Sequence, residues 1–405
     1  MSKIKILLTE NIHQVAQEKL QAEGYHVDLI KHAPTEEEFL KILPEYHVLG
    51  IRSKSDLTHQ ILDKNRHLLA VGAFCIGTNQ IQLATATQVG IPVFNAPHSN
   101  TRSVAELVIA EMIALSRQLA DRSSLAHKGE WVKSADGSRE VRGKTLGIIG
   151  YGHIGSQLSV LAESMGMKVV FFDIIKKLPL GNAKAMTKLD ELLSVSDFVS
   201  LHVPETPETK NMIARTQLVQ MKKGSYLINA SRGTVVVIED LVEALKSKHL
   251  AGCAIDVFPV EPASNKETFT TPLQGIGNVI LTPHIGGSTE EAQYSIGLEV
   301  AESFRKFLQT GTTAGAVNFP NVDLSPKSNV TRLMNVHKNE PGVLGEINGY
   351  ISEASANIQA QYLSTDPQIG YLVVDLEMDK AKLPAIELIK KIEKSSRNIK
   401  THLVF

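Results

Sequence analysis

Three side chains in the second half of the chain have the chemistry of a proton-transfer site. They are Arg232, Glu261 and His284, which carry a guanidinium, a carboxylate and an imidazole. An imidazole titrates near neutrality and suits a general base, and a nearby carboxylate orients it and raises its pKa. A guanidinium binds a carboxylate in a fork geometry that lysine cannot reproduce. Together these groups predict oxidation of a 2-hydroxy acid, in which His284 takes the hydroxyl proton and Arg232 binds the carboxylate or carbonyl.

The elements that must position these three residues are buried strands. The residues follow, in turn, the apolar runs SYLIN (225–229), AGCAID (251–256) and VILT (279–282). In a doubly wound parallel sheet the carboxyl ends of the strands form the edge where ligands bind. Each residue alone is also typical of a structural turn or a solvated surface, so the prediction depends on their shared position.

A glycine motif earlier in the chain predicts the cofactor. Gly150, Gly152 and Gly155 follow the apolar run 145–149 and precede apolar residues at helical spacing. Such a strand, turn and helix binds a pyrophosphate at the helix N-terminus. Asp173 ends the next strand, 18 positions past the last glycine, where its carboxylate would accept from a ribose 2′-hydroxyl and repel a 2′-phosphate. The motif therefore predicts NAD rather than NADP, and the alternative is an ordinary glycine-rich turn.

The first hundred residues alternate short apolar strands with helical segments, which predicts a second parallel sheet covered by helices. The fold class predicted is thus α/β, with two doubly wound Rossmann-like domains. Arg52 ends the run 48–52 and Ser53 follows it directly. Asn100 precedes a long apolar helix over 103–119, where the second domain starts. These loop positions are available to ligands, although for Arg52 a surface charge at a strand end is an equal alternative.

Residues 328–405 have the order of a ferredoxin-like domain. A linker over 320–327 (PNVDLSPK) precedes it. Strands are predicted over 329–336, 358–363, 370–377 and 399–405, and helices over 343–354 and 381–394. The resulting order is βαββαβ, which predicts a third domain at the C-terminal end of the chain.

Composition argues against several classes of function. Forty-two Lys and Arg against 43 Asp and Glu leave a net charge of −1, so no charge excess predicts binding to nucleic acid or an anionic membrane. Cys75 and Cys253 lie in apolar runs, which favours reduced core thiols over a disulfide framework or a metal site. The N-terminus has too short an apolar run for a signal peptide, and no stretch approaches the roughly 18 apolar residues of a membrane span. We therefore expect a cytoplasmic protein without a metal.

Four motifs carry a resemblance to a known family, namely GIIGYGHIG at 147–155, INASRG at 228–233, AIDVFPVEP at 254–262 and LTPHIGGST at 281–289. In these motifs, and over nearly all 405 residues, the chain resembles the D-2-hydroxyacid dehydrogenases. The resemblance implies that Arg232, Glu261 and His284 are catalytic. It implies substrate contacts at Arg52, Ser53, Asn100 and Arg232. It also implies cofactor contacts at Gly150, Gly152, His153, Ile154, Gly155, Asp173, Ala230, Arg232, Asp256, His284, Gly286 and Gly287.

The resemblance further implies how the domains divide. A discontinuous substrate-binding domain over 1–99 and 288–320 would flank an NAD-binding domain over 100–287, and an ACT-type regulatory domain would cover 328–405. The amino-acid effector of such a domain in this family is L-serine. Its predicted contacts are His337, Asn339 and Asn357. A homotetramer is implied as well.

The activity implied by the resemblance is NAD-dependent oxidation of D-3-phosphoglycerate, inhibited by L-serine, with reduction of 2-oxoglutarate as a side activity. Lys54 stands where some relatives have arginine, which leaves the phosphate contact open. Two alternatives remain. One is a dehydrogenase for another D-2-hydroxy acid, and the other is an NAD-sensing binding protein similar to transcriptional corepressors of this fold.

Overall fold

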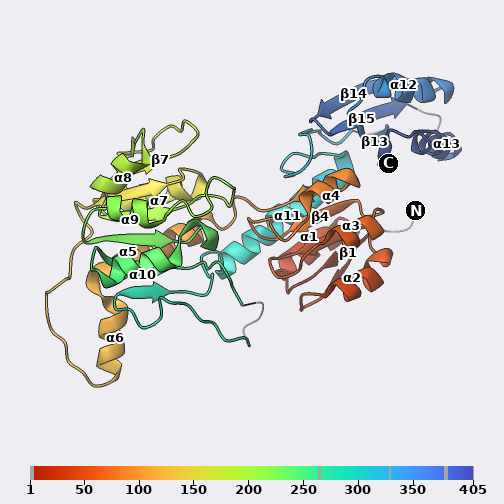
Figure 1. Ribbon diagram of the computed structural model, residues 1–405. Coiled ribbons are helices and arrows are strands. Elements are labelled where there is room, and N and C mark those ends of the chain that lie inside the picture. The colour runs from red at the N-terminus through yellow and green to blue at the C-terminus, as the bar shows by residue number, and fades with distance from the viewer. Residues whose placement is uncertain (1–3, 263–265, 328–329, 378–381, 405) are drawn as a thin grey trace. The chain divides into compact units, whose positions relative to one another are not determined.

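The computed structural model describes residues 4–262, 266–327, 330–377 and 382–404. The chain forms two compact units, one made of residues 1–99 with 293–405 and the other of residues 100–292 (Figure 1). The predicted element ends at Asn329, Ala381 and Phe405 lie outside the described residues.

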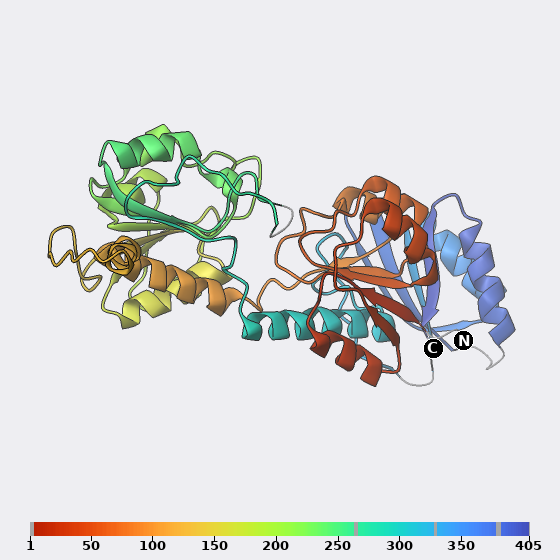
Figure 2. The same cartoon turned by 90° about the horizontal axis from the view of Figure 1, so that it is seen from below.

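The first unit contains a five-stranded parallel sheet with the order β2-β1-β3-β4-β5. Its strands are β1 (Lys5–Leu8), β2 (His26–Leu29), β3 (Val48–Ile51), β4 (Ala70–Ala73) and β5 (Val93–Phe94). The helices are α1 (Gln14–Ala22), α2 (Glu36–Ile42), α3 (His59–Lys64), α4 (Leu83–Gln88) and α11 (Glu290–Thr310), with a 3-10 turn at Leu43–Glu45. Helices α1 and α11 lie on one side of this sheet and α2, α3 and α4 on the other (Figure 2). Side chains of the first pair pack in one apolar cluster, and those of the other three helices pack in a second. The central strands are therefore buried on both faces, as parallel strands require.

A four-stranded antiparallel sheet with the order β14-β15-β13-β16 also belongs to the first unit. Its elements in chain order are β13 (Thr331–Lys338), α12 (Val343–Glu353), β14 (Asn357–Thr365), β15 (Ile369–Glu377), α13 (Lys382–Glu393) and β16 (Asn398–Val404). The predicted βαββαβ order is confirmed. Successive side chains of a strand point to opposite faces. Leu372 and Val374 accordingly pack with α12 and α13, whereas Tyr371 and Val373 pack in the cluster that contains Phe307 of α11.

The second unit contains a seven-stranded parallel sheet with the order β12-β11-β10-β9-β6-β7-β8. The strands are β6 (Thr145–Ile149), β7 (Lys168–Phe172), β8 (Lys184–Ala185), β9 (Phe198–Leu201), β10 (Ser225–Asn229), β11 (Leu250–Ile255) and β12 (Val279–Leu281). The helices are α5 (Thr101–Arg117), α6 (Leu119–His127), α7 (His153–Ser164), α8 (Leu189–Val195), α9 (Arg215–Gln220) and α10 (Ile238–Lys246), with a 3-10 turn at Gly233–Val235. The strand order reverses between β6 and β9, and a crevice for a ligand forms at such a point. The predicted fold class is confirmed.

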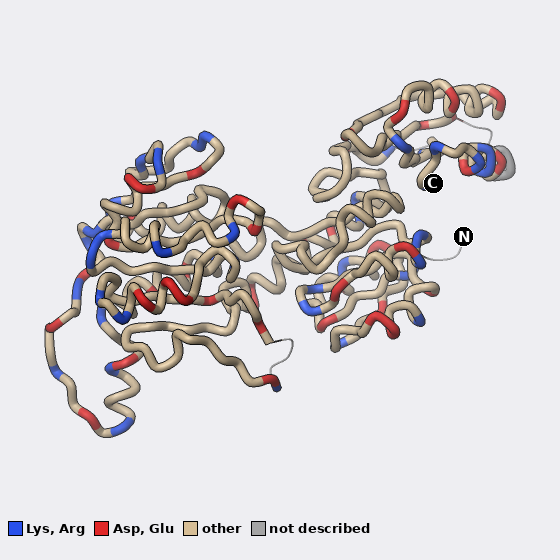
Figure 3. Tube along the Cα trace, in the orientation of Figure 1, with Lys and Arg blue, Asp and Glu red and all other residues tan. Residues whose placement is uncertain are grey.

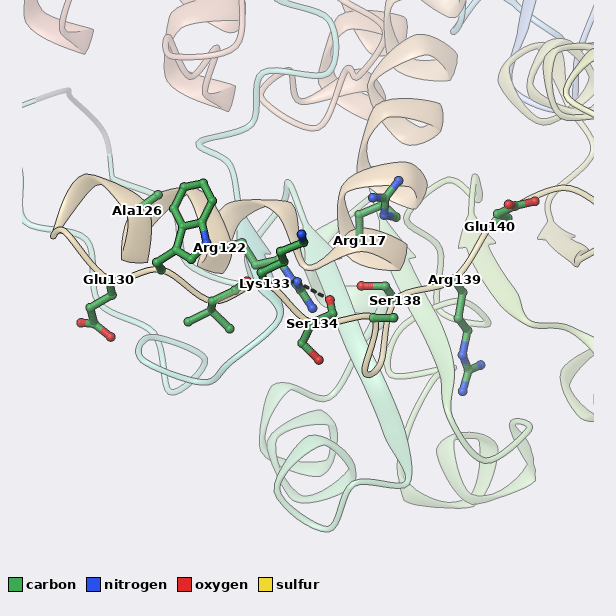
Figure 4. Close-up of a pocket in the computed structure, with 12 residues that line it drawn as sticks. Arg117, Arg122, Ala126, Glu130, Lys133, Ser134, Ser138, Arg139 and Glu140 are labelled. Carbon is green, nitrogen blue, oxygen red and sulfur yellow. Dashed lines mark hydrogen bonds between the residues drawn. The ribbon is translucent and has the colours of Figure 1, made fainter.

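The helix predicted over 103–119 ends earlier than expected. Gln118 has a left-handed backbone with φ of 51°, which ends α5 and begins the separate helix α6. An irregular segment follows α6, and its Trp131 is 87% exposed. Trp131 and its neighbours line an open hollow of about 780 Å³ with Arg117, Arg122 and Arg139 (Figure 4). The hollow shares no residue with the predicted active site.

Charges of both signs are interspersed along the trace of each unit, as the net charge of −1 leads one to expect (Figure 3). Among the described residues, no helix combines the length and the apolar character needed to cross a membrane. Nor do three or more His, Cys, Asp or Glu side chains gather anywhere in this part of the chain to hold a metal ion.

Candidate active site

The glycine turn lies between β6 and α7, at the point where the sheet order reverses. Gly150 has φ of 91°, and a Cβ on it would lie 2.4 Å from the carbonyl oxygen of His202, so a larger residue does not fit. Gly152 precedes the first residue of α7, and a Cβ there would have no heavy atom within 4 Å. The space beside Gly152, next to the first residue of α7, is therefore open. This geometry fits a pyrophosphate, and the residues present suit the predicted dinucleotide.

Asp173 follows β7 directly and lies beside the glycine turn. Its Oδ2 accepts a hydrogen bond from the Tyr151 N–H at 2.8 Å, and its Oδ1 accepts one from the Ile175 N–H at 2.9 Å. The two bonds fix the carboxylate at the edge of the turn. A carboxylate in this position can accept from a ribose hydroxyl and repels a phosphate.

We expect Asp173→Asn to weaken the preference for NAD over NADP by about tenfold, because the substitution removes a negative charge that repels the 2′-phosphate. The asparagine keeps an oxygen that can accept from the Tyr151 N–H, so the turn itself is preserved. The ratio of kcat/KM for the two cofactors measures the effect. Asp190→Asn, at the exposed start of α8, is the control and leaves the ratio unchanged.

Arg232 lies in a tight turn after β10 that Asn229 organises. The buried Asn229 accepts from the N–H and the hydroxyl of Ser231 at 3.1 and 2.8 Å, and its Nδ2 donates to the carbonyl oxygen of Arg232 at 3.0 Å. The Arg232 Nη1 donates to the Ser231 carbonyl oxygen at 2.7 Å. Sequence reasoning did not identify Asn229, although a buried asparagine at a strand end is itself a signal of a specified turn.

Gly233 allows this turn to approach the segment that carries Glu261. A Cβ on Gly233 would lie 2.0 Å from the Phe258 carbonyl carbon, so the two chain segments can touch only without a side chain there. Glu261 folds back on the same segment, where its Oε1 accepts from the Phe258 N–H at 3.0 Å. The other oxygen, Oε2, pairs with Nδ1 of His284 at 2.8 Å. The structure thus brings the Arg232 turn, Glu261 and His284 to the same edge of the sheet.

His284 lies in a loop after β12 that is held by Asp256. His284 has a left-handed backbone with φ of 53°, and its N–H donates to the Asp256 carbonyl oxygen at 2.8 Å. The Asp256 carboxylate is 1% exposed and accepts from the Thr282 hydroxyl, the Ile285 N–H and the Gly286 N–H at 2.6, 2.8 and 2.9 Å. Asp256 was predicted to contact the cofactor. In this structure its carboxylate fixes the loop that carries His284.

The His284 imidazole and the Glu261 carboxylate each shift the pKa of the other. The hydrogen bond with Glu261 is the largest influence on His284, and with the negative charges of Glu261 and Asp256 it raises the pKa of the imidazole despite partial burial and the charge of Arg232. Burial alone would raise the pKa of Glu261. The bonds from His284 and the Phe258 N–H, with the positive charges of His284 and Arg232, outweigh burial and hold that pKa below its usual value. The pair is therefore a base that gains a proton readily and a carboxylate that stays charged.

We expect Glu261→Gln to lower the pKa of His284, because it removes the main group that stabilises the imidazolium. With His284 as the predicted base, the rate of oxidation rises as pH passes upward through the pKa of His284, so the acid limb of its pH profile should move to lower pH. With His284 as the predicted acid, the rate of reduction falls as pH rises through the same pKa, so the alkaline limb of its profile should also move to lower pH. Profiles of kcat/KM against pH in both directions check the sign. Unmoved profiles would contradict the coupling.

The other predicted substrate contacts are Asn100, Arg52 and Ser53. Asn100 precedes α5, and its Nδ2 would lie 2.5 Å from a Cβ on Gly287, so it contacts the His284 loop. Ser103, the third residue of α5, donates to the Gly286 carbonyl oxygen at 2.6 Å and supports the same loop. Arg52 and Ser53 belong to the first unit, directly after β3. Their substrate role stays a prediction.

Two of the three predicted effector residues, His337 and Asn357, lie on the terminal sheet, and Asn339 follows the end of β13. His337 is buried near the end of β13, its Nδ1 pairs with the Asn335 Oδ1 at 2.8 Å, and burial lowers the pKa of the imidazole. Asn339 donates to the Asp366 carbonyl oxygen at 2.6 Å. Asn357 begins β14 and donates to Glu377 at 3.3 Å. His337 is paired with Gly370 and Asn357 with Glu377, so they lie at opposite ends of β15.

Comparison with known proteins supports the assignment of the fold and cofactor. Residues 109–286 match the D-isomer specific 2-hydroxyacid dehydrogenase, NAD binding domain, and residues 333–396 match an AHAS small subunit-like ACT domain. The predicted ACT-type domain is therefore confirmed. The solved D-lactate dehydrogenase from Aquifex aeolicus, complexed with NAD and lactic acid, superposes with a TM-score of 0.69 at 28% identity, covering 78% of this chain and 100% of that chain.

Curated relatives match over nearly the whole length. The chain is 54% identical to D-3-phosphoglycerate dehydrogenase of Haemophilus influenzae, over 98% of this chain and 97% of that protein. It is 55% identical to D-3-phosphoglycerate dehydrogenase of Escherichia coli, over 93% of this chain and 92% of that protein. The chain therefore belongs to the D-3-phosphoglycerate dehydrogenases, within the NAD-dependent D-isomer specific 2-hydroxyacid dehydrogenases.

Proposed function

We propose that this chain oxidises D-3-phosphoglycerate to 3-phosphooxypyruvate with NAD, as the first step of L-serine biosynthesis. The main support for the proposal is the hydrogen bond of 2.8 Å between His284 Nδ1 and Glu261 Oε2. It lies at the same edge of the sheet as Arg232. Relatives named D-3-phosphoglycerate dehydrogenase at 54% and 55% identity support the choice of substrate.

His284 handles the proton in this proposal. With Nδ1 donating to Glu261, the basic nitrogen is Nε2, which takes the proton of the C2 hydroxyl. Bound NAD supplies the acceptor for the hydride that leaves C2, and the C2–O bond becomes a carbonyl. The imidazolium that forms is stabilised by Glu261, which stays charged throughout.

Arg232 holds the substrate's carboxylate in this proposal, because its guanidinium extends from a turn that Asn229 fixes. Arg52, Ser53 and Asn100 are the further substrate contacts that the family resemblance implies. We also propose reduction of 2-oxoglutarate as a side activity, since its second carboxylate can replace the phosphate as the anionic group farthest from the reacting carbon.

One steady-state assay tests the activity. NADH oxidation by the purified protein is followed with 3-phosphooxypyruvate, and with pyruvate, glyoxylate and 2-oxoglutarate for comparison. We expect 3-phosphooxypyruvate to have the highest kcat/KM. Good reduction of pyruvate or glyoxylate without reduction of 3-phosphooxypyruvate would instead assign another D-2-hydroxy acid. NADH binding without any turnover would favour a corepressor-like binding role.

We further propose that L-serine inhibits the enzyme by binding between two terminal sheets of a homotetramer. His337 and Asn357 are separated by seven residues along β15, which is about 23 Å at ~3.3 Å per residue. A single serine cannot contact both residues of one chain. A site that uses both therefore takes His337 and Asn339 from one chain and Asn357 from another.

A mixing experiment tests this effector site. By calorimetry, His337→Ala and Asn357→Ala should each lose serine binding, because each lacks one half of every site. Hybrids formed by mixing the two variants should regain binding, because one of the two sites at each mixed interface then has both halves intact. Hybrids that bind no serine, or unmodified protein that binds none, would exclude the site.

We also propose that the enzyme works in the cytoplasm. Cys253 is a buried thiol that forms no disulfide with another described residue, and burial raises its pKa. A buried, reduced thiol of this kind suits a reducing compartment. Fractionation of cells that express the chain checks the location.

A further inference from the structure

Glu10 is a buried carboxylate that lies outside the predicted catalytic and binding residues. It follows β1, is 6% exposed and has a left-handed backbone with φ of 58°. A residue other than glycine, asparagine or aspartate rarely adopts this conformation, so the surrounding structure must stabilise it. The main chain does so in part, because the N–H of Glu10 donates to the His32 carbonyl oxygen at 3.0 Å and that of Asn11 donates to the Ile30 carbonyl oxygen at 3.3 Å.

The carboxylate of Glu10 is bound to the loop that follows β3. Its Oε1 accepts from the N–H of Arg52 at 3.0 Å and from that of Ser55 at 3.1 Å. Its Oε2 accepts from the N–H of Lys54 at 2.9 Å. Three main-chain donors from four successive residues therefore converge on one carboxylate. Hydrogen bonds to an ionised acceptor are about twice as strong as those between neutral groups, so this contact holds the loop firmly.

The same loop is held from a second direction. Gln80 donates from Nε2 to the Arg52 carbonyl oxygen at 2.7 Å. Among the described residues, no hydrogen bond or ion pair engages the Arg52 guanidinium, so no polar side-chain bond orients it. The direction of the guanidinium thus depends on the backbone of residues 52–55, and Glu10 supplies most of the bonds to that backbone.

We propose that Glu10 is a positioning residue for substrate binding, which acts by fixing the backbone of residues 52–55 and so the direction of the Arg52 side chain. The inference rests on the proposed function, in which Arg52 and Ser53 contact the substrate. A contact to a part of the substrate that does not react stabilises the ground state and the transition state alike. Its loss raises KM for that substrate and leaves kcat unchanged.

The test compares Glu10→Gln with Glu18→Gln, which changes an exposed glutamate of α1. Glutamine keeps the length of the side chain but lacks the charge and offers an amide N–H₂ toward one of the three donors. For Glu10→Gln we expect KM for D-3-phosphoglycerate to rise about tenfold, with kcat and KM for NAD within about twofold of the unmodified enzyme. The amides of Arg52, Lys54 and Ser55 should exchange faster with solvent. Glu18→Gln should change none of these quantities.

Two further variants, Glu10→Asp and Arg52→Ala, distinguish a positioning role of Glu10 from a purely structural one. Glu10→Asp tolerates the left-handed backbone and keeps the charge, but it is one methylene too short to reach all three N–H groups, so it should fold and raise KM by about threefold. Arg52→Ala tests the substrate contact itself. If Arg52→Ala raises KM while Glu10→Gln and Glu10→Asp change only thermal stability, Glu10 is a structural residue and our inference is wrong. If Arg52→Ala leaves KM unchanged, the proposed substrate contact fails and the inference fails with it, although the dehydrogenase activity stands.

Discussion

Replacing His284 with alanine is expected to lower kcat for oxidation of D-3-phosphoglycerate by about 10³-fold, within the range that a general base contributes. The imidazole is held at 2.8 Å by Glu261 and has a raised pKa, and in the proposed mechanism it both accepts the hydroxyl proton and returns it in the reverse reaction. Alanine leaves solvent water as the base, which is far weaker. Steady-state kinetics in both directions should show the same loss, because one group serves both.

Two further variants test whether the fall in kcat comes from loss of the base or from disruption of the loop that carries residue 284. His284→Gln keeps a polar side chain of similar reach but cannot take a proton, so its kcat should fall as far as that of the alanine variant. His127→Ala removes an exposed histidine at the end of α6 and should leave kcat unchanged. Calorimetry should still detect NAD binding to every variant. If both His284 variants keep kcat within about tenfold of the unmodified enzyme, the base is another group.

Replacing Arg232 with glutamine is expected to lower kcat/KM for 3-phosphooxypyruvate by about 10²- to 10³-fold, because the anionic substrate loses a charged, bidentate partner. Arg232→Lys should recover part of this loss, since the ammonium keeps the charge but not the fork. The turn should survive both changes. Asn229 bonds to the backbone oxygen of residue 232 and to Ser231, not to the guanidinium.

Arg215→Lys is the matched control for this prediction. Arg215 is an exposed arginine at the start of α9 that pairs with Asp240 and Glu243, so its replacement should leave kcat/KM unchanged. Arg232→Gln should also lower the stability of the substrate complex more than that of the NAD complex. Equal activity in Arg232→Gln and the unmodified enzyme would place the substrate's carboxylate on another cation.

The arrangement of Arg232, Glu261 and His284 could be predicted from the sequence because it depends on a simple rule. Each residue follows a buried apolar run, and the carboxyl ends of parallel strands meet at one edge of the sheet. The glycine turn was equally predictable, since Gly150 and Asp173 depend on local backbone geometry and on the neighbouring strand. The break between α5 and α6 was missed, because the apolar pattern continues through Gln118 while its backbone turns left-handed.

The role of Glu10 could not be predicted in this way. Its partners Arg52, Lys54 and Ser55 lie more than 40 residues further along the chain, and no periodic pattern relates the two segments. Asn229 was missed for a similar reason, since its three hydrogen bonds depend on the closed turn that they stabilise. Such contacts arise when two loops at the same sheet edge pack together.

By itself the sequence determined the fold class, the dinucleotide turn and the strand ends that carry Arg232, Glu261 and His284, because periodicity and strand order follow from local chemistry. Only the tertiary structure decided that Glu261 pairs with His284 through Nδ1, and that Asp256 holds the His284 loop. It also decided that His337 and Asn357 lie at opposite ends of β15. These facts depend on contacts between residues distant in the chain, and the folded backbone sets such contacts where sequence spacing does not.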